Sequence, residues 1–402
     1  MSVKILTVCQ YYYPEQFRIN DICEALVKSG HEVTVLTGLP NYPLGIIPRE
    51  YKFFRKRKEI INGVSVIRCF EIGLRGGRIK IALNYISYML SASLKVLFLK
   101  NKFDIIFIYQ LSPVIMAIPG IIFAKLHHRK TFLYCLDIWP ESIKTMNFSE
   151  TGFIYKLIHK VSKWIYRKCD YIGVSTKYFI NYLSEKNKVS ANKIAFVPQH
   201  AEDIYLDVSE KKENASRIDF LFAGNIGRVQ NIECILQAVS KIRTKKEFIV
   251  NFVGDGSFED EAKLISKKLD IDEKIVFHGR HPLDRMCDFY TNSDALLLTL
   301  KGDSPLGLTI PGKLQGYIAS GKPILGSISG LANDLIREAN CGEYVEADDC
   351  EGLAILMEDF IKNPLRYKIY GENGRKYFIN NFTLDIFIER IETKLYELLK
   401  EI

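Results

Sequence analysis

The segment Leu300–Ile324, LKGDSPLGLTIPGKLQGYIASGKPI, predicts the end of a strand, a loop and a short helix, which is the repeating unit of the expected fold. It continues the apolar run Ala295–Leu300, which has the length and composition of a buried strand. A loop containing glycine and proline follows, and we expect a short helix to open at Pro311 and end at Gly321. A loop between a parallel strand and a helix start is where α/β proteins bind anions.

Lys313 makes this segment a candidate site. It stands in the first turn of the expected helix, where the helix dipole disfavours a cation. A bound phosphate would explain a lysine at this position, and an ordinary surface lysine explains it equally well. The segment alone leaves both interpretations open.

Short apolar runs alternate with helical patterns along the chain, which predicts βαβ units and an α/β fold with parallel sheets. A chain of 402 residues exceeds the usual size of one hydrophobic core, so we expect two domains. The polar segment Gln199–Arg217 interrupts the alternation and is the expected linker. The first domain is therefore placed at residues 1–198 and the second at residues 199–377.

The composition favours an anionic partner. The net charge of +8 suits nucleotide phosphates, a pyrophosphate lipid, an anionic membrane surface or nucleic acid. The nine cysteines show no C-x-x-C and no paired spacing with histidine, which indicates reduced thiols of a cytoplasmic protein. No signal peptide is evident, and no apolar window reaches the ~20 uninterrupted residues of a spanning helix.

Small and polar residues follow several predicted strands of the second half, and the carboxyl ends of parallel strands share one edge of a sheet. Glycine lets a backbone approach a ligand closely, and basic side chains can neutralise a diphosphate. Tight strand–helix turns also need glycine, so each cluster alone is weak evidence. The candidate ligand-binding residues are Gly224, Asn225, Gly227, Arg228, Gly254, Arg280, Thr309, Pro311, Gly312 and Lys313.

Two acidic residues flank Trp139-Pro140 at the end of a predicted strand in the first half. Asp137 and Glu141 can act as a general base or bind sugar hydroxyls, beside a tryptophan face that suits sugar C–H groups. The alternative is that Asp137 caps a helix starting at Pro140. Glu15 likewise is either a site residue or a helix cap. His200 is either a site residue or a structural histidine.

A basic patch with interleaved aromatic residues precedes the predicted helix Ile79–Lys100. Such a patch is typical of a membrane-surface or nucleic-acid footprint, although most charged runs are simply solvated faces. No recognised nucleic-acid module coincides with it. Its basic residues are Lys52, Arg55, Lys56, Arg57, Lys58, Arg75, Arg78 and Lys80.

Over essentially its whole length the chain resembles the family 4 glycosyltransferases of the GT-B fold, and within them the WbuB-like subgroup that builds bacterial surface polysaccharide. The segments that carry the resemblance are YYPEQFRIN (12–20), GHEVTVLT (30–37), LPNYP (39–43), LDIWPE (136–141), AGNIG (223–227), VGDG (253–256) and IPGKLQGYIASGKP (310–323). The resemblance implies two Rossmann-like parallel-sheet domains that face a central cleft, with a last helix, about residues 378–402, packing back on the first domain.

The resemblance also implies an activity. Such enzymes transfer a sugar with retention from a nucleotide donor, usually UDP-linked, without a bound metal or other cofactor. The donor binds to the C-terminal domain and the acceptor to the N-terminal one, so the residues above become donor contacts. Here we expect an N-acetylated amino sugar and a polyprenyl-pyrophosphate-linked acceptor in capsule, O-antigen or exopolysaccharide synthesis, on the inner face of the bacterial cytoplasmic membrane. The acceptor-side candidates are Glu15, Gln16, Asn41, Tyr42 and His200.

The sequence departs from the family pattern at its usual catalytic positions. The expected Gly-Gly is Gln16-Phe17, and the expected histidine falls near Tyr109-Gln110. The Arg and Lys that commonly hold the diphosphate align with Asn225 and Gln230, and the paired glutamates align with Leu308 and Gly316. Asp137 therefore becomes the leading catalytic candidate, with Glu141 beside it. Alternatives are a nucleotide-sugar epimerase, a soluble-acceptor transferase and a non-catalytic nucleotide-sugar-binding subunit.

Overall fold

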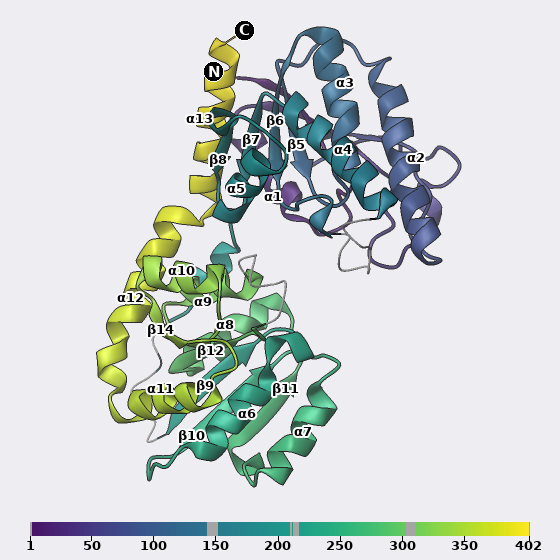
Figure 1. Ribbon diagram of the computed structural model, residues 1–402. Helices are drawn as coiled ribbons and strands as arrows, with labels where there is room; N and C mark the ends of the chain where they lie inside the picture. Colours follow the sequence, from purple (N-terminus) through teal and green to yellow (C-terminus); the bar gives the residue numbers. More distant parts are fainter. Residues whose placement is uncertain (1, 143–151, 210, 212–216, 303–310, 402) are drawn as a thin grey trace. The chain divides into compact units, whose positions relative to one another are not determined.

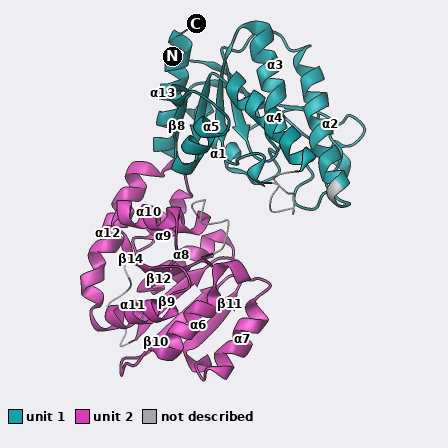
Figure 2. Ribbon diagram, in the orientation of Figure 1, with its two compact units in different colours: residues 1–199, 384–402 teal, residues 200–383 magenta. Residues whose placement is uncertain are grey.

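A computed structural model describes residues 2–142, 152–209, 211, 217–302 and 311–401. The chain forms two compact units, which Figures 1 and 2 show in sequence colours and in separate colours. Unit 1 contains residues 1–199 and 384–402, and unit 2 contains residues 200–383. Each unit has one sheet with helices packed on it.

The sheet of unit 1 has the strand order β3-β4-β2-β1-β5-β6-β7-β8. Every neighbouring pair is parallel except β3 and β4, which form an antiparallel hairpin at the sheet edge. The strands are β1 (Lys4–Val8), β2 (Glu32–Thr37), β3 (Lys58–Ile61), β4 (Val64–Arg68), β5 (Ile105–Gln110), β6 (Lys130–Cys135), β7 (Tyr171–Val174) and β8 (Ile194–Phe196). The central strands are apolar and almost fully buried, as expected for a parallel sheet covered on both faces.

The helices of unit 1 form two groups. Helices α2, α3 and α4 are neighbours, with the short helix η2 (Val114–Ala117) in contact with both α2 and α4 (Figure 1). Helix α1 packs against α13, the last helix of the chain. The bounds are α1 (Arg18–Lys28), α2 (Arg78–Val96), α3 (Ile118–His127), α4 (Phe153–Lys168), α5 (Lys177–Glu185) and α13 (Leu384–Lys400).

The sheet of unit 2 is entirely parallel, in the order β11-β10-β9-β12-β13-β14. Its strands are β9 (Ile218–Ala223), β10 (Phe248–Val253), β11 (Ile275–Gly279), β12 (Ala295–Thr299), β13 (Ile324–Ser327) and β14 (Gly342–Val345). Its helices are α6 (Ile232–Lys241), α7 (Glu259–Lys268), α8 (Leu283–Asn292), α9 (Gly312–Ser320), α10 (Leu331–Ala339), α11 (Cys350–Lys362) and α12 (Pro364–Asn381).

Helix α13 returns the chain to unit 1. Its buried residues Phe387, Ile388, Ile391, Leu395 and Leu398 belong to the unit 1 core. The Val3 N–H donates to His31 Nδ1 (3.2 Å), so the hydrogen of the neutral ring lies on Nε2, which donates to Glu392 of α13 (3.0 Å).

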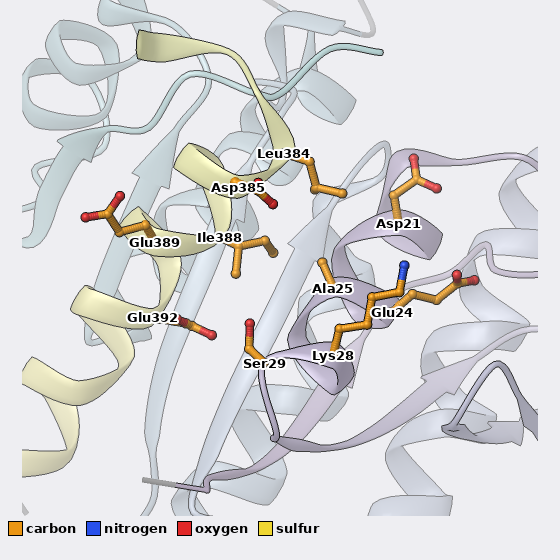
Figure 3. Close-up of a pocket in the computed structure, with 10 residues that line it drawn as sticks. All are labelled: Asp21, Glu24, Ala25, Lys28, Ser29, Leu384, Asp385, Ile388, Glu389 and Glu392. Atoms are coloured by element: carbon orange, nitrogen blue, oxygen red, sulfur yellow. The ribbon is translucent and has the colours of Figure 1, made fainter. Parts of the chain in front are cut away.

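The returning helix was expected at about residues 378–402, and this boundary was too early. Phe378 and Phe382 are buried in the core of unit 2, and α12 continues to Asn381. The return to unit 1 therefore begins at Leu384. A pocket of about 480 Å³ lies between α1 and α13, and Figure 3 shows the side chains that line it.

The predicted strand Ala295–Leu300 is β12 and the predicted helix Ile79–Lys100 is α2, with bounds that differ by one to four residues. The predicted helix start at Pro311 also differs, because Pro311 is the N-cap and α9 begins at Gly312. The hairpin strand β3 was missed because its sequence, KEII, continues a basic run. Helices α4 and α5 were also not predicted.

Candidate functional site

The carboxyl edge of the unit 2 sheet brings three glycine turns together. The Gly224 N–H donates to Val253 O (2.8 Å), and the Gly254 N–H donates to Gly279 O (2.9 Å). Gly224 and Gly254 have φ angles of +131° and +140°, which side-chain-bearing residues rarely adopt. A Cβ added at Gly254 would lie 1.9 Å from Gly224 O. Glycine at 254 is therefore required by backbone packing, whatever it contacts in a complex.

Helix α9 is fixed to this edge by Tyr317. The Ala223 N–H at the end of β9 donates to the Tyr317 hydroxyl (2.8 Å), which in turn donates to Ala223 O (3.3 Å). Leu314, Tyr317 and Ile318 form the buried apolar face of this helix. The helix ends, as predicted, at Gly321, whose backbone is left-handed with φ +72°.

Lys313 lies one turn before Tyr317 on the same side of α9, so its side chain reaches the end of β9. Its Nζ lies 3.7 Å from the centre of the Phe222 ring. A Cβ added at Gly224 would lie 3.1 Å from this Nζ, so the lysine occupies space that a side chain at 224 would take.

The Lys313 amine is buried and, among the described residues, has no hydrogen-bond partner. Burial disfavours the charged form and lowers the pKa of Lys313 from its usual 10.5 to about 7. A buried amine without a hydrogen-bond acceptor costs free energy, and an anion would satisfy it. Among the predicted site residues, Lys313 therefore has the environment that most favours binding of an anion.

Arg228 does not share this environment. It is exposed, forms an ion pair with Glu261 of α7, and lies over the Phe258 ring (5.3 Å). Asn225 donates through Nδ2 to Gln230 Oε1 (3.2 Å), beside Gly227. Arg280 is exposed directly after β11.

The β12 end is joined to the β9–α6 turn and to the β14 end. Thr299 Oγ1 donates to Gln230 O (2.6 Å). The Asp348 carboxylate accepts from Asn231 Nδ2 (2.7 Å) and from the Gly302 N–H (3.0 Å). Thr309 lies outside the described residues, whereas Pro311 and Gly312 stand at the start of α9.

In unit 1, the acceptor-side candidates Glu15, Asn41 and Tyr42 meet at the carboxyl edge of the sheet. Glu15 Oε1 accepts from the backbone N–H groups of Asn41 (2.7 Å) and Tyr42 (2.5 Å). Burial raises the pKa of Glu15, while these two hydrogen bonds oppose that shift. Glu15 therefore holds the 41–42 backbone, and the Glu15 side chain is buried rather than open to solvent.

Glu71 was not among the predicted site residues, and both it and Glu15 accept hydrogen bonds from Asn41. Glu71 is fully buried after β4 and accepts from the side-chain amides of Asn41, Asn84 (3.4 Å) and Gln10 (3.3 Å). Burial, and next the charge of Glu15, raise the pKa of Glu71 well above its usual value. Its position at a strand end was the available signal, but burial cannot be read from one residue.

Aromatic rings border the Glu15 loop. Tyr11 stacks on Phe17 (5.2 Å between ring centres), and both approach Tyr42 (5.9 and 5.3 Å). Tyr42 and Gln16 are exposed. Tyr11 and Phe17 were not predicted as site residues, and their stacked rings support the exposed Tyr42 ring.

Among the described residues, Asp137 and Glu141 accept hydrogen bonds from different side chains. The Asp137 carboxylate accepts from the hydroxyls of Ser112 and Ser142 and from the Trp139 indole (3.2 Å). Glu141 accepts from Tyr155 of α4 (2.8 Å) and from Tyr182 of α5 (2.6 Å).

The position of the usual family histidine is occupied by hydrogen-bonded structural groups. Gln110 is buried and donates through Nε2 to Asp137 O (2.9 Å). Tyr109 accepts through its hydroxyl from Gln199 Nε2 (2.8 Å). His200 is buried at the start of unit 2, immediately after Gln199.

The basic patch lies in unit 1, and its exposed members include Lys52, Arg55, Lys56, Lys58, Arg75 and Lys80. Phe53 and Phe54 are each 85% exposed and have positive φ angles (51° and 64°). No helix in the described ranges is long and apolar enough to cross a membrane. In the same ranges, no group of three or more His, Cys, Asp or Glu residues is arranged to hold a metal ion.

Comparison with known proteins identifies both halves of the chain. Residues 17–199 match the family model Glycosyltransferase Family 4, and residues 206–377 match Glycosyl transferases group 1. The chain is 25% identical to the probable glycosyltransferase WbjE of Pseudomonas aeruginosa over 285 residues, which are 68% of this chain and 69% of the relative.

Two further proteins cover more of the chain. The putative colanic acid biosynthesis glycosyl transferase WcaI of Escherichia coli is 23% identical over 338 residues, 79% of this chain and 82% of the relative. The crystal structure of Anabaena Alr3699/HepE in complex with UDP superimposes with a TM-score of 0.69 and 12% identity, over 99% of this chain and all of that one. From the two family matches and the shared fold, the chain belongs to the family 4 glycosyltransferases of the GT-B fold.

Proposed function

We propose that the chain transfers a sugar, with retention, from a UDP-type nucleotide donor bound by unit 2 to a polyprenyl-pyrophosphate-linked sugar bound by unit 1. The sugar is an N-acetylated amino sugar, and the product enters capsule, O-antigen or exopolysaccharide synthesis. The relative named for colanic acid biosynthesis and the similar structure that contains UDP support this proposal. The WbuB-like pattern of Thr309–Lys313 adds to it.

The observation that carries the proposal is the buried Lys313 amine, which has no hydrogen-bond partner among the residues that the structure describes. It lies at the carboxyl edge of a parallel sheet, between a glycine turn and a helix start. Parallel sheets bind nucleotides at this edge, where backbone N–H groups and a helix N-terminus favour an anion. A donor diphosphate at this place supplies the charge that the buried amine lacks.

The same arrangement suggests how the reaction proceeds. The bond between the anomeric carbon and the diphosphate oxygen breaks, and a bond to the acceptor hydroxyl oxygen forms on the same face. The departing diphosphate takes the hydroxyl proton. Protonated Lys313 and the first turn of α9 stabilise the charge that develops on the leaving UDP, which is often the largest contribution to catalysis. No step needs a metal ion, so we expect transfer to continue in a chelating buffer.

Arg228 and Arg280 take secondary parts in this proposal. Arg228 can reach the diphosphate only by exchanging its ion pair with Glu261. Because exposed ion pairs contribute little, this exchange costs roughly 0–1 kcal/mol. In this proposal Gly279, the last residue of β11, and Arg280 directly after it hold the base.

Asp137 is assigned a positioning role in place of proton transfer. Both of its oxygens already accept hydrogen bonds from Ser112, Trp139 and Ser142. These contacts orient the Trp139 ring and the loop that holds it. The acceptor sugar then lies against exposed aromatic and polar groups of the unit 1 edge, with Tyr42 and Gln16 nearest to solvent.

The test is transfer by the purified chain from a panel of nucleotide sugars to a polyprenyl-pyrophosphate-linked acceptor. Lys313→Ala removes the proposed leaving-group contact and should lower turnover by ~10²–10³, the usual effect of losing one such donor. Lys263→Ala, which removes an exposed lysine on α7, is the matched control and should leave turnover unchanged. Near-normal turnover of both Lys313→Ala and Arg228→Ala would refute the site assignment.

A further inference from the structure

Helix α2 of unit 1 presents an apolar stripe to solvent. Its outward residues Ile79, Leu83, Ile86, Leu90 and Leu94 are between 40% and 78% exposed. Their spacing of four, three, four and four residues places them on one side of the helix.

The opposite side of α2 is the side that packs into the protein. Asn84, Tyr88, Ala92 and Val96 are fully buried there. A helix on the surface of a globular protein normally turns charged and polar residues outward. The exposed stripe of α2 contains no charged or polar residue. The side of the helix that faces solvent is therefore apolar.

Helix α4 presents a second apolar surface in the same group of helices. Phe153, Ile154, Leu157 and Trp164 are 45% to 80% exposed, whereas Ile165 and Tyr166 are buried. Both α2 and α4 contact η2, and α3 contacts both of them as well (Figure 1). The exposed residues of α2 and α4 therefore belong to one layer of neighbouring helices, here called the α2–α4 surface.

The charge of this layer is entirely positive. Lys or Arg stands at nine positions of α2, α3 and α4, and Asp or Glu at none, although the whole chain has 47 acidic residues. Five of the nine are in α4: Lys156, Lys160, Lys163, Arg167 and Lys168. An exposed apolar face flanked by lysine and arginine is the pattern of helices that lie in a membrane interface.

We propose that the α2–α4 surface docks on an anionic lipid bilayer, with its apolar residues among the acyl-chain boundary and its basic residues against lipid phosphates. The proposal rests on the lipid-linked acceptor proposed above and identifies where unit 1 meets the membrane that carries it. A bilayer fits better than a protein partner, because three neighbouring helices with basic but no acidic residues are complementary to a continuous negative surface. Docking leaves α2 and α4 lying on the bilayer and does not require a spanning helix.

Co-sedimentation of the full chain with vesicles free of acceptor tests the docking alone. We expect binding to phosphatidylglycerol-containing vesicles, weaker binding to pure phosphatidylcholine, and release by added salt. The triple variant Lys156→Gln, Lys160→Gln, Lys168→Gln should weaken partitioning on the order of 100-fold, since each basic residue contributes roughly fivefold. The matched control is Lys263→Gln, Lys267→Gln, Lys268→Gln on α7, which removes the same charge from exposed positions of unit 2 and should bind as the wild type does.

Substitutions of exposed leucines and the fluorescence of Trp164 test the apolar part of the α2–α4 surface. Leu90→Ser with Leu94→Ser should also weaken binding to anionic vesicles. Trp164 is a native reporter on α4, and brominated lipid should quench its fluorescence in the bound protein. Trp164→Phe should abolish most of that quenching while co-sedimentation persists, because the remaining tryptophan, Trp139, lies in the Asp137 loop.

Three results would overturn the proposal. They are no binding to anionic vesicles, equal loss of binding in the α4 and α7 triple variants, or a concentration-dependent dimer that the Leu90/Leu94 variant dissociates. UDP binding by the same preparations separates this proposal from the enzymatic one. Loss of vesicle binding with intact UDP binding counts against docking only. Vesicle binding without any transfer to a lipid-linked acceptor counts against the proposed function only.

Discussion

At the scale of single residues, Lys313 shows how a site can be recognised from an unmet interaction. Its amine is held between Gly224 and the Phe222 ring, without an acceptor among the described residues. A residue kept only for stability would not leave a buried donor unsatisfied, because such a group costs about 1–3 kcal/mol. The unfavourable interaction in the free protein is what a bound diphosphate would relieve.

Lys313→Met should therefore stabilise the free protein. Methionine fills similar space against Phe222 without a polar group, so we expect the free energy of unfolding to rise by about 1–3 kcal/mol. The gain should be largest below pH 7. Between pH 7 and 10.5 the unfolded chain binds the proton that folded Lys313 releases, so wild-type stability rises with pH in that window. Urea unfolding across this range measures the effect, and a destabilised Lys313→Met would contradict it.

Glu71 should show the opposite dependence on pH. Its raised pKa means that the folded protein keeps a proton that the unfolded chain loses above the usual glutamate value of 4.5. Stability should fall as pH rises from there toward the folded pKa. Glu71→Gln should remove this slope at little cost near neutrality, because glutamine resembles the protonated acid. Glu71→Ala should cost about 1–3 kcal/mol for each buried amide it leaves without an acceptor. If Glu71→Gln kept the wild-type pH slope, the assignment would be wrong.

Residue types at strand ends could be predicted, but their partners could not. Lys313, Asn41 and Glu15 were expected at sheet edges and lie there. Glu71 was missed, and Arg228 was expected to face a ligand but is paired with Glu261. These outcomes depend on contacts between residues 26 to 61 positions apart, which local patterns do not encode.

At the scale of elements, the glycine turns of unit 2 hold strands close enough for α9 to reach β9. Gly254 passes over Gly224 O, and Tyr317 fixes α9 to Ala223. Helix α9 was predicted from Pro311 to Gly321 by its proline and glycine, and it spans Gly312–Ser320. Helix α4 was not predicted, and four of its five basic residues, Lys156, Lys160, Arg167 and Lys168, are exposed.

Gly254→Ala should destabilise unit 2 strongly. The added Cβ would overlap Gly224 O, and φ +140° is unfavourable for alanine, so we expect a loss of about 1–3 kcal/mol from backbone strain alone. Gly312→Ala is the matched control, because a Cβ there meets nothing within 4 Å. Thermal unfolding of the two variants compares them directly. Equal stability would show that the turn is not as tightly packed as described.

At the scale of the whole molecule, the chain passes between units twice, after Gln199 and after Thr383. The two-unit α/β architecture follows from the alternation of strands and helices, which repeats on either side of a polar segment. The position of the second crossing could not be predicted. Helices α12 and α13 are both apolar enough to be buried, and only tertiary packing assigns Phe378 to one unit and Phe387 to the other.

A chain ending at Thr383 should lose the stability of unit 1 and keep that of unit 2. The truncation removes five buried apolar side chains of α13, each worth about 1.5–3 kcal/mol, from a domain whose margin is typically about 5–15 kcal/mol. Calorimetry should show one lost transition and one retained transition that UDP still raises. An unchanged unit 1 transition would contradict the assignment of α13 to its core.

Calorimetric titration of UDP decides whether the Lys313 amine holds the donor diphosphate, as proposed. Wild type should bind UDP with proton uptake, and its affinity should fall on the order of tenfold from about pH 6.5 to about pH 8.5, because bound phosphate requires the protonated amine. Lys313→Met should bind roughly 10- to 100-fold more weakly at the lower pH, as expected for a lost charged hydrogen bond, and without that pH dependence. Equal UDP affinity of wild type and Lys313→Met at both pH values would contradict the claim.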